Sequence, residues 1–280
     1  MKKGYRSSRW PLLAALLLLQ PVTAHEFWLQ PQQYHFNPGE LANIRFRVGE
    51  HFEGENWSGN RNRVQQLTLY LGDVEDDLST QMGMHEGDSL QFSLFEEGTA
   101  VVTFQSTNSF IELDAEKFNA YLNEDGLQQA LSYRSAHGET DSSGREYYQR
   151  SVKTLLQYGM RTTPVYRKST RLPLDLIPLS HPYDPASGDT LHLKVLFQQH
   201  PLTGAKLRTW HRLAGRVTEN SYYTNEAGEV RFPISRSGEW MASCVHMVRL
   251  ANDPRAQWQS YWGSITWGYT GKITPRQNSR

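Results

Sequence analysis

Short segments in which apolar and polar residues alternate recur along this chain and restrict it to a β-rich fold. In residues 41–48 the alternation places Ile44, Phe46 and Val48 on one face, as expected for a strand, whose successive side chains point to opposite sides. Similar segments lie at residues 67–71, 90–95, 100–104, 191–197, 206–212, 229–232, 240–247 and 261–267. Short strands at this spacing predict antiparallel sandwiches.

A helical periodicity interrupts the strands at about residues 113–159. Asp114 is a good N-cap, and apolar residues follow it at helical spacing as far as Leu122. Apolar residues recur at the same spacing in residues 148–156, ahead of a C-cap at Gly159. The pattern therefore predicts a short α-helical insertion of two helices.

The predicted fold is all-β, with two β-sandwich domains of the immunoglobulin or transthyretin type. The N-terminal sandwich, residues 25–165, contains the helical insertion, and the C-terminal sandwich covers residues 166–280. Prolines between residues 164 and 185 mark the crossing from one to the other. The chain is long enough for two domains of ordinary size.

Residues 1–24 have the features of a secretory signal peptide. Four basic residues precede an apolar run of eight residues at 12–19, and a small-residue cleavage pattern ends at Ala24. The apolar run is shorter than the roughly 20 residues that span a bilayer. We therefore expect a periplasmic protein, exported through a cleaved leader and without stable membrane insertion after cleavage.

Charge, cysteine content and the absence of catalytic motifs exclude several classes of function. Loss of the leader removes four basic and no acidic residues, which changes the formal charge from 0 to −4 and argues against nucleic-acid partners. Cys244 is the only cysteine, so no intramolecular disulfide holds the fold. The sequence contains no nucleophile elbow, zinc-protease motif, P-loop or dinucleotide fingerprint, so we predict that the protein is not an enzyme.

Cleavage after Ala24 would make His25 the first residue of the mature chain. A terminal histidine carries an α-amine and an imidazole on one residue, and the two nitrogens together chelate a transition metal. His51 follows a predicted strand, where binding loops are common. His246 shares one strand face with Cys244, a residue that we interpret as a small buried apolar group rather than a ligand.

Several motifs together resemble one exported bacterial family. They are residues 25–31 (HEFWLQP), 49–54 (GEHFEG), 116–122 (EKFNAYL), Trp240 with 245–247 (VHM), and 258–266 (WQSYWGSIT). The chain resembles the domain of unknown function 4198 family, whose members are described as periplasmic components of cobalt or nickel uptake. The resemblance implies two all-β domains with a short helical insertion, and a site at the motif histidines His25, His51 and His246.

The leading hypothesis is a periplasmic protein that binds a divalent transition metal for uptake or homeostasis. His25, His51 and His246 would supply nitrogen, and Glu26, Glu50, Glu53 and Cys244 are weaker candidates as ligands or supporting groups. Nitrogen-rich sites suit nickel, cobalt, copper or zinc. The partners would be the metal ion and an inner-membrane metal transporter.

Two other functions remain open from the sequence. A terminal histidine with a second imidazole is also the copper brace of enzymes that cleave polysaccharides oxidatively, and Trp258, Tyr261, Trp262 and Trp267 would then hold a glycan. Alternatively, tandem sandwiches often serve as non-catalytic adhesion or scaffold modules.

Overall fold

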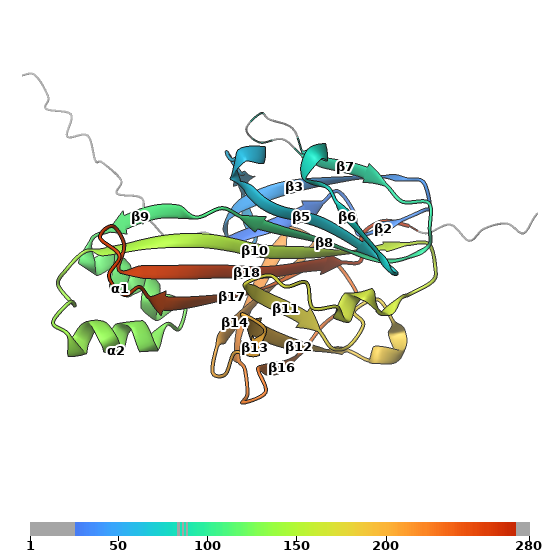
Figure 1. The fold of residues 1–280 in the computed structure, drawn as a ribbon. Coiled ribbons are helices and arrows are strands. Elements are labelled where there is room, and N and C mark those ends of the chain that lie inside the picture. Colours follow the sequence, from blue (N-terminus) through green and yellow to red (C-terminus); the bar gives the residue numbers. More distant parts are fainter. Residues whose placement is uncertain (1–25, 83–84, 86, 88, 273–280) are drawn as a thin grey trace, which may run out of the picture.

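The computed structural model describes residues 26–82, 85, 87 and 89–272. Three sheets make up its β structure, and two long neighbouring strands, β10 (Gly144–Tyr158) and β18 (Trp258–Gly268), run through the middle of the molecule (Figure 1). The central sheet has ten strands in the order β15-β14-β17-β18-β10-β8-β5-β6, with β2 and β9 also paired to β10. The all-β class with a short helical insertion is thus confirmed.

The remaining strands of the central sheet are β2 (His35–Phe36), β5 (Val64–Leu71), β6 (Val74–Asp77), β8 (Gly98–Ser106), β9 (Ser109–Leu113), β14 (Lys206–Leu213), β15 (Arg216–Tyr223) and β17 (Glu239–Arg249). The first outer sheet contains β1 (Glu26–Pro31), β3 (Leu41–Glu50), β4 (Glu53–Asn56) and β7 (Leu90–Ser93). The second contains β11 (Leu174–Pro178), β12 (Thr190–Phe197), β13 (His200–Pro201) and β16 (Glu229–Pro233).

The two outer sheets cover opposite faces of the central sheet. On β8, Val102 and Phe104 belong to the core shared with the first outer sheet, whereas Val101 belongs to the core shared with the second. All nine residues of β8 are buried, as expected for a strand covered on both sides. Each outer sheet therefore has its own hydrophobic core against the central one.

The central sheet joins strands from both predicted sandwiches. β10 pairs in parallel with β18 from Glu146 opposite Trp258 to Thr154 opposite Thr266. The second core also includes Tyr70, Val101 and Leu155, which precede the predicted boundary near residue 165. Backbone hydrogen bonding likewise continues across this boundary. The crossing itself is partly packed, because β11 is buried throughout its length.

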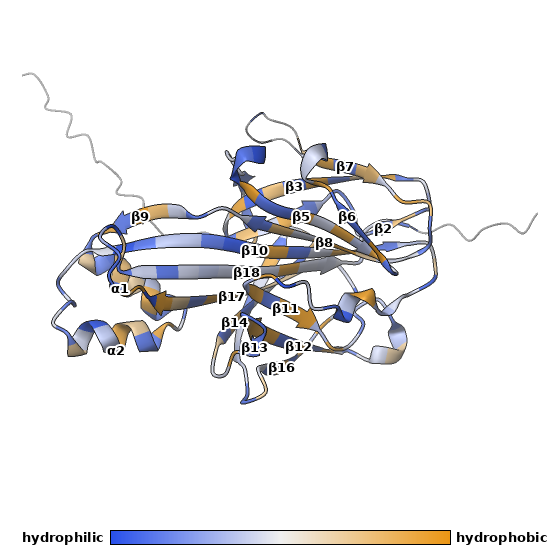
Figure 2. Cartoon of the chain, viewed as in Figure 1, coloured by the Kyte–Doolittle hydropathy of each residue, from blue (hydrophilic) through white to orange (hydrophobic). Residues whose placement is uncertain are grey.

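The predicted second helix of residues 148–156 is wrong, because this segment lies within strand β10. Its apolar residues occur at helical spacing, yet the strand is buried on both faces in its C-terminal half. Burial on both faces removes the polar alternation that identifies a strand from sequence. Figure 2 shows the change along β10, whose half near the helices is hydrophilic and whose other half is more apolar.

The helical insertion consists of α1 (Ala115–Glu124) and α2 (Gln128–Ala136). Asp114 is the N-cap of α1 as predicted, and its Oδ1 accepts a hydrogen bond of 2.9 Å from the Lys117 amide. Apolar residues of both helices pack against β17 and β18. The short 3-10 helices are η1 (Arg61–Arg63), η2 (Ser79–Gln81), η3 (Pro164–Arg167) and η4 (Pro185–Ser187).

Within the described residues, neither α-helix has the length and apolar character needed to cross a bilayer. The predicted leader, residues 1–24, and His25 lie outside the part of the chain that the structure describes.

Candidate functional site

Among the predicted metal ligands, His51 lies on the hairpin that joins β3 to β4. His51 and Phe52 form its two-residue turn between Glu50 and Glu53, which pair with each other. Both turn residues have positive φ, 51° for His51 and 60° for Phe52, as a two-residue hairpin turn requires. A phenylalanine rarely adopts this conformation, so the tertiary structure must hold it.

Phe52 anchors the hairpin turn. Its ring is fully buried against Trp28, Trp210 and Met241, and the guanidinium of Arg212 lies 4.4 Å from its centroid. Arg212 Nη1 also donates a 2.8 Å hydrogen bond to the Phe52 carbonyl. These contacts offset the backbone strain and place the neighbouring His51 at the surface.

His51 meets a carboxylate from a distant part of the chain. Its Nδ1 lies 3.3 Å from Glu219 Oε2 on β15. The His51 side chain is 72% exposed and that of Glu219 is 33% exposed, so the imidazole remains accessible to a ligand. A carboxylate bonded to one imidazole nitrogen sets the ring orientation, as in many metal sites.

His25 precedes Glu26 in sequence, and Glu26 begins β1 opposite Gly49, two residues before His51. The Glu26 side chain is buried, and its Oε1 lies 2.6 Å from Arg208 Nη2 on β14. The geometry of this contact leaves Glu26 Oε1 without a directional hydrogen bond. Glu26, which directly follows the predicted His25 chelate, thus has a buried carboxylate oxygen that accepts no hydrogen bond.

Arg208 binds two further carboxylates at the end of α1. Its Nη2 lies 2.5 Å from Asp125 Oδ1, and its Nη1 lies 3.1 Å from Glu124 Oε1. Burial raises the pKa of Glu26 to about 8 and that of Asp125 to about 7, although Arg208 opposes both shifts. We call Glu26, Glu124, Asp125 and Arg208 the Arg208 cluster; its acidic groups outnumber its basic one.

The carboxylates Glu50 and Glu53 flank the hairpin turn. Within the described ranges, no group of three or more His, Cys, Asp and Glu side chains is arranged to hold a metal ion. His51 and Glu219 therefore do not form such a group with other described residues.

The structure does not bring His246 to His51. Along β14 and β17, Trp210 pairs with Met241 and Leu207 with Cys244, so Cys244 and His246 project to the face opposite Trp210. Glu219 pairs with Trp210 and therefore shares its face. His51 and His246 consequently lie on opposite sides of the central sheet.

His246 packs instead between aromatic rings of the second outer sheet and β18. Its ring centroid lies 4.3 Å from that of Phe197, and Tyr261 is its partner across the strands. Burial lowers the pKa of His246 to about 4. On the same face Cys244 is buried, and burial raises its pKa to about 12, consistent with the apolar role expected for it.

The aromatic residues proposed for glycan stacking do not form an open face. Trp258 and Trp267 are buried, at 2% and 0% exposure, and Tyr261 and Trp262 are half-buried. Trp267 stacks on Trp240 within the second core. The rings of Trp258 and Trp267 fill the interior, and those of Tyr261 and Trp262 pack against the cores.

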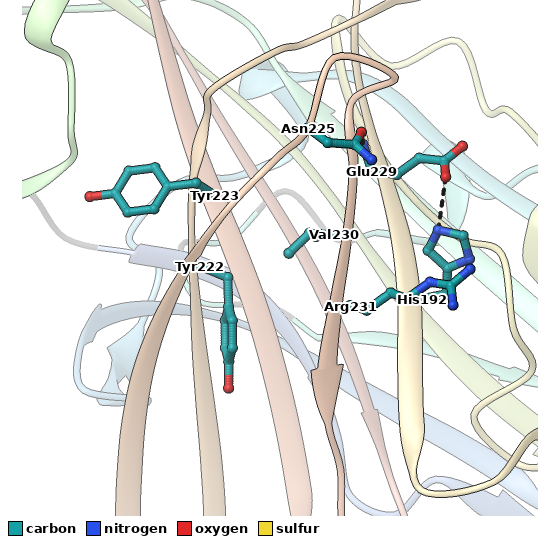
Figure 3. Close-up of a pocket in the computed structure, with 7 residues that line it drawn as sticks. All are labelled: His192, Tyr222, Tyr223, Asn225, Glu229, Val230 and Arg231. Carbon is teal, nitrogen blue, oxygen red and sulfur yellow. Dashed lines mark hydrogen bonds and ion pairs between the residues drawn. The ribbon is translucent and has the colours of Figure 1, made fainter.

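A surface pocket of about 400 Å³ lies at the edge of the second outer sheet (Figure 3). Within it, His192 Nε2 lies 3.0 Å from Glu229 Oε2. Figure 3 shows the phenols of Tyr222 and Tyr223 directed away from this pair. The polar groups that line this pocket do not point toward one common position, so the pocket is not the candidate functional site.

Sequence reasoning missed Glu219, Arg208 and Asp125. Glu219 lies on β15, a mostly exposed polar strand without apolar alternation. Arg208 lies in a predicted strand, but nothing in its spacing indicates that its partners are Glu26 and Asp125. These contacts join residues more than 80 positions apart. The order of the strands in the sheets brings these residues together, and local sequence patterns do not reveal that order.

Comparison with known protein families agrees with the resemblance found in the motifs. The family described as "Domain of unknown function (DUF4198)" matches residues 22–248. Among solved structures, "Structures of Clostridium thermocellum CbhA fibronectin(III)-like modules" is similar at 8% identity, covering 89% of this chain and 100% of that chain. Its TM-score of 0.21 supports no argument about fold or function. A search of curated proteins gives no significant match. Because the family match spans most of the sequence, this chain belongs to the DUF4198 family.

Proposed function

We propose that this protein is exported to the periplasm and binds a divalent late transition metal there, in metal uptake or homeostasis. The donors would be the α-amine and imidazole of His25 together with the imidazole of His51. Glu219 would act as an additional ligand or as the group that orients His51. Nickel, cobalt, copper and zinc all accept such nitrogen-rich donor sets.

The observation that carries the proposal is the position of the His51 turn. The turn follows the strand residues paired with the start of β1, and Phe52 fixes it in the core. An accessible imidazole is thus held beside the end of the strand that His25 precedes. The Glu219 carboxylate beside His51 favours a cation at this position. His246 is outside this donor set because it lies on the opposite face of the sheet.

Calorimetric titration of the mature protein, beginning at His25, with nickel and copper tests the proposal. We expect a 1:1 complex that weakens by at least about tenfold when one residue is added ahead of His25 or when His51→Ala removes an imidazole. His246→Gln and His200→Ala are the matched controls and should bind metal as the unaltered protein does. Equal affinity in the extended protein would refute the chelate, and loss of binding only in His246→Gln would refute the proposed donor set.

Affinity should also fall as the pH decreases. The amine and imidazoles must lose protons to bind metal, and a free α-amine titrates at about 7.7–8.0. Titrations at pH 8 and pH 6 measure this effect. Formation of peroxide that depends on copper and a reductant would instead favour the oxidative enzyme over the carrier.

A further inference from the structure

A second pocket, of about 440 Å³, is lined by residues of β3, η1, β9 and β10 and contains two arginines. It is lined by Val48, Trp57, Ser58, Gly59, Asn60, Arg63, Ser109, Tyr148 and Arg150. No acidic residue is among these described lining residues. A pocket with two guanidinium groups and several neutral polar groups is suited to a negatively charged ligand.

Arg150 extends from β10 into this pocket without a carboxylate partner among the described residues. Its guanidinium carbon lies 4.7 Å from the ring centroid of Phe27 and 5.2 Å from that of Tyr148. Burial and the neighbouring Arg63 lower its pKa. The aromatic rings hold the planar guanidinium but do not neutralise its charge.

Arg63, from η1, supplies the second guanidinium. Its Nη2 donates to Ser109 Oγ, and no ion pair of Arg63 occurs in the described part of the chain. Ser109 lines the same pocket, so this hydrogen bond holds the Arg63 side chain at the pocket. Two like charges are thus kept close together, and their mutual repulsion would be relieved by an anion.

The pocket also has an apolar wall. Trp57 lines it and forms part of an aromatic cluster with Phe27, Phe46 and Phe104. Val48 lines it as well and is half-buried. The wall suits the organic part of a ligand whose charged group faces the arginines.

We propose that this pocket binds a small organic anion, whose carboxylate or phosphate group accepts hydrogen bonds from Arg63 and Arg150 while its body lies against Trp57 and Tyr148. This site is separate from the proposed metal site and shares no residue with it. Guanidinium groups match both carboxylate and phosphate oxygens in geometry. The structure therefore indicates an anionic group, and the experiment below decides whether that group is a carboxylate or a phosphate.

Calorimetric titration without metal, at about 0.15 M ionic strength to suppress weak surface binding, tests the site with four probes. The probes are acetate, benzoate, inorganic phosphate and phenyl phosphate, which separate the charged group from the aromatic body. We expect saturable binding of benzoate or phenyl phosphate, tighter than that of acetate or inorganic phosphate. Absence of saturable binding by all four would overturn the proposal.

Two arginines on the same 3-10 helix provide a matched pair of variants. Arg63→Gln should weaken binding by about tenfold or more, because it removes one of the two guanidinium groups that would donate hydrogen bonds to the anion. Arg61→Gln removes the same charge from η1 at a residue that does not line the pocket, and should leave affinity unchanged. Equal weakening in both variants would show non-specific attraction and refute the site. Arg150→Lys, which keeps the charge but loses the planar fork, should also weaken binding.

Discussion

Arg208 Nη2 lies between two buried carboxylates, 2.6 Å from Glu26 Oε1 and 2.5 Å from Asp125 Oδ1. Glu26 belongs to the first outer sheet, Asp125 to the end of α1 and Arg208 to the central sheet. One side chain therefore ties together three parts of the fold, next to the predicted start of the mature chain.

Removal of this arginine should destabilise the protein strongly. Arg208→Met leaves Glu26 and Asp125 buried without their cation, and loss of one partner of a buried ion pair costs about 3–5 kcal/mol. Urea unfolding followed by tryptophan fluorescence measures the change. Adding Glu26→Gln and Asp125→Asn to Arg208→Met should recover part of the loss; a triple variant less stable than Arg208→Met would contradict the assignment.

Stability should fall as the pH rises from about 6.5 to 8. Burial raises the pKa of Glu26, Asp125 and Glu146 to about 8, 7 and 8, so the folded protein retains protons that the unfolded chain has already lost. The free energy of unfolding therefore decreases with pH across this window. His181 and His246, whose pKa values burial lowers to about 4, act in the opposite direction only below their ordinary pKa of about 6.5.

The variant Glu26→Gln with Asp125→Asn tests the origin of this pH dependence. It should flatten the decrease in unfolding free energy between pH 6.5 and pH 8, measured by urea unfolding at several pH values. An unchanged slope would show that other groups cause the dependence.

Phe52→Ala should affect both stability and the candidate metal site. The ring is fully buried, and truncation of such a phenylalanine costs about 3–5 kcal/mol. It also releases the hairpin turn, so metal affinity should fall even though no proposed donor is removed. Phe95→Ala is the control, because Phe95 is 78% exposed; a comparable loss there would argue against a specific role for Phe52.

A second buried ion pair connects β10 to the second outer sheet. Lys153 and Asp175 are 1% and 0% exposed, and Asp175 also accepts a 2.8 Å hydrogen bond from the Thr170 amide. Lys153→Met should cost about 3–5 kcal/mol in unfolding free energy. Lys168→Met breaks a surface pair with Glu75 and should cost less than about 1 kcal/mol. Equal losses measured by urea unfolding would rule out a special contribution from the buried pair.

The sequence was sufficient to predict nine of the eighteen described strands and the first helix. The alternation at residues 41–48 corresponds to β3, and Asp114 caps α1, because these elements depend on local periodicity and capping. The same reasoning failed at residues 148–156, since burial on both faces of β10 removed the alternation. It also gave no sign of the mostly exposed β15.

The sequence also supplied the prediction of a leader, the resemblance to the family and the histidines to be compared. Only the tertiary structure decided which of these share a face. His51 and Glu219 meet, and His246 lies across the sheet, because strand order and register between distant segments fix the direction of every side chain. Those long-range pairings have no signature in local spacing, so the candidate site required the fold.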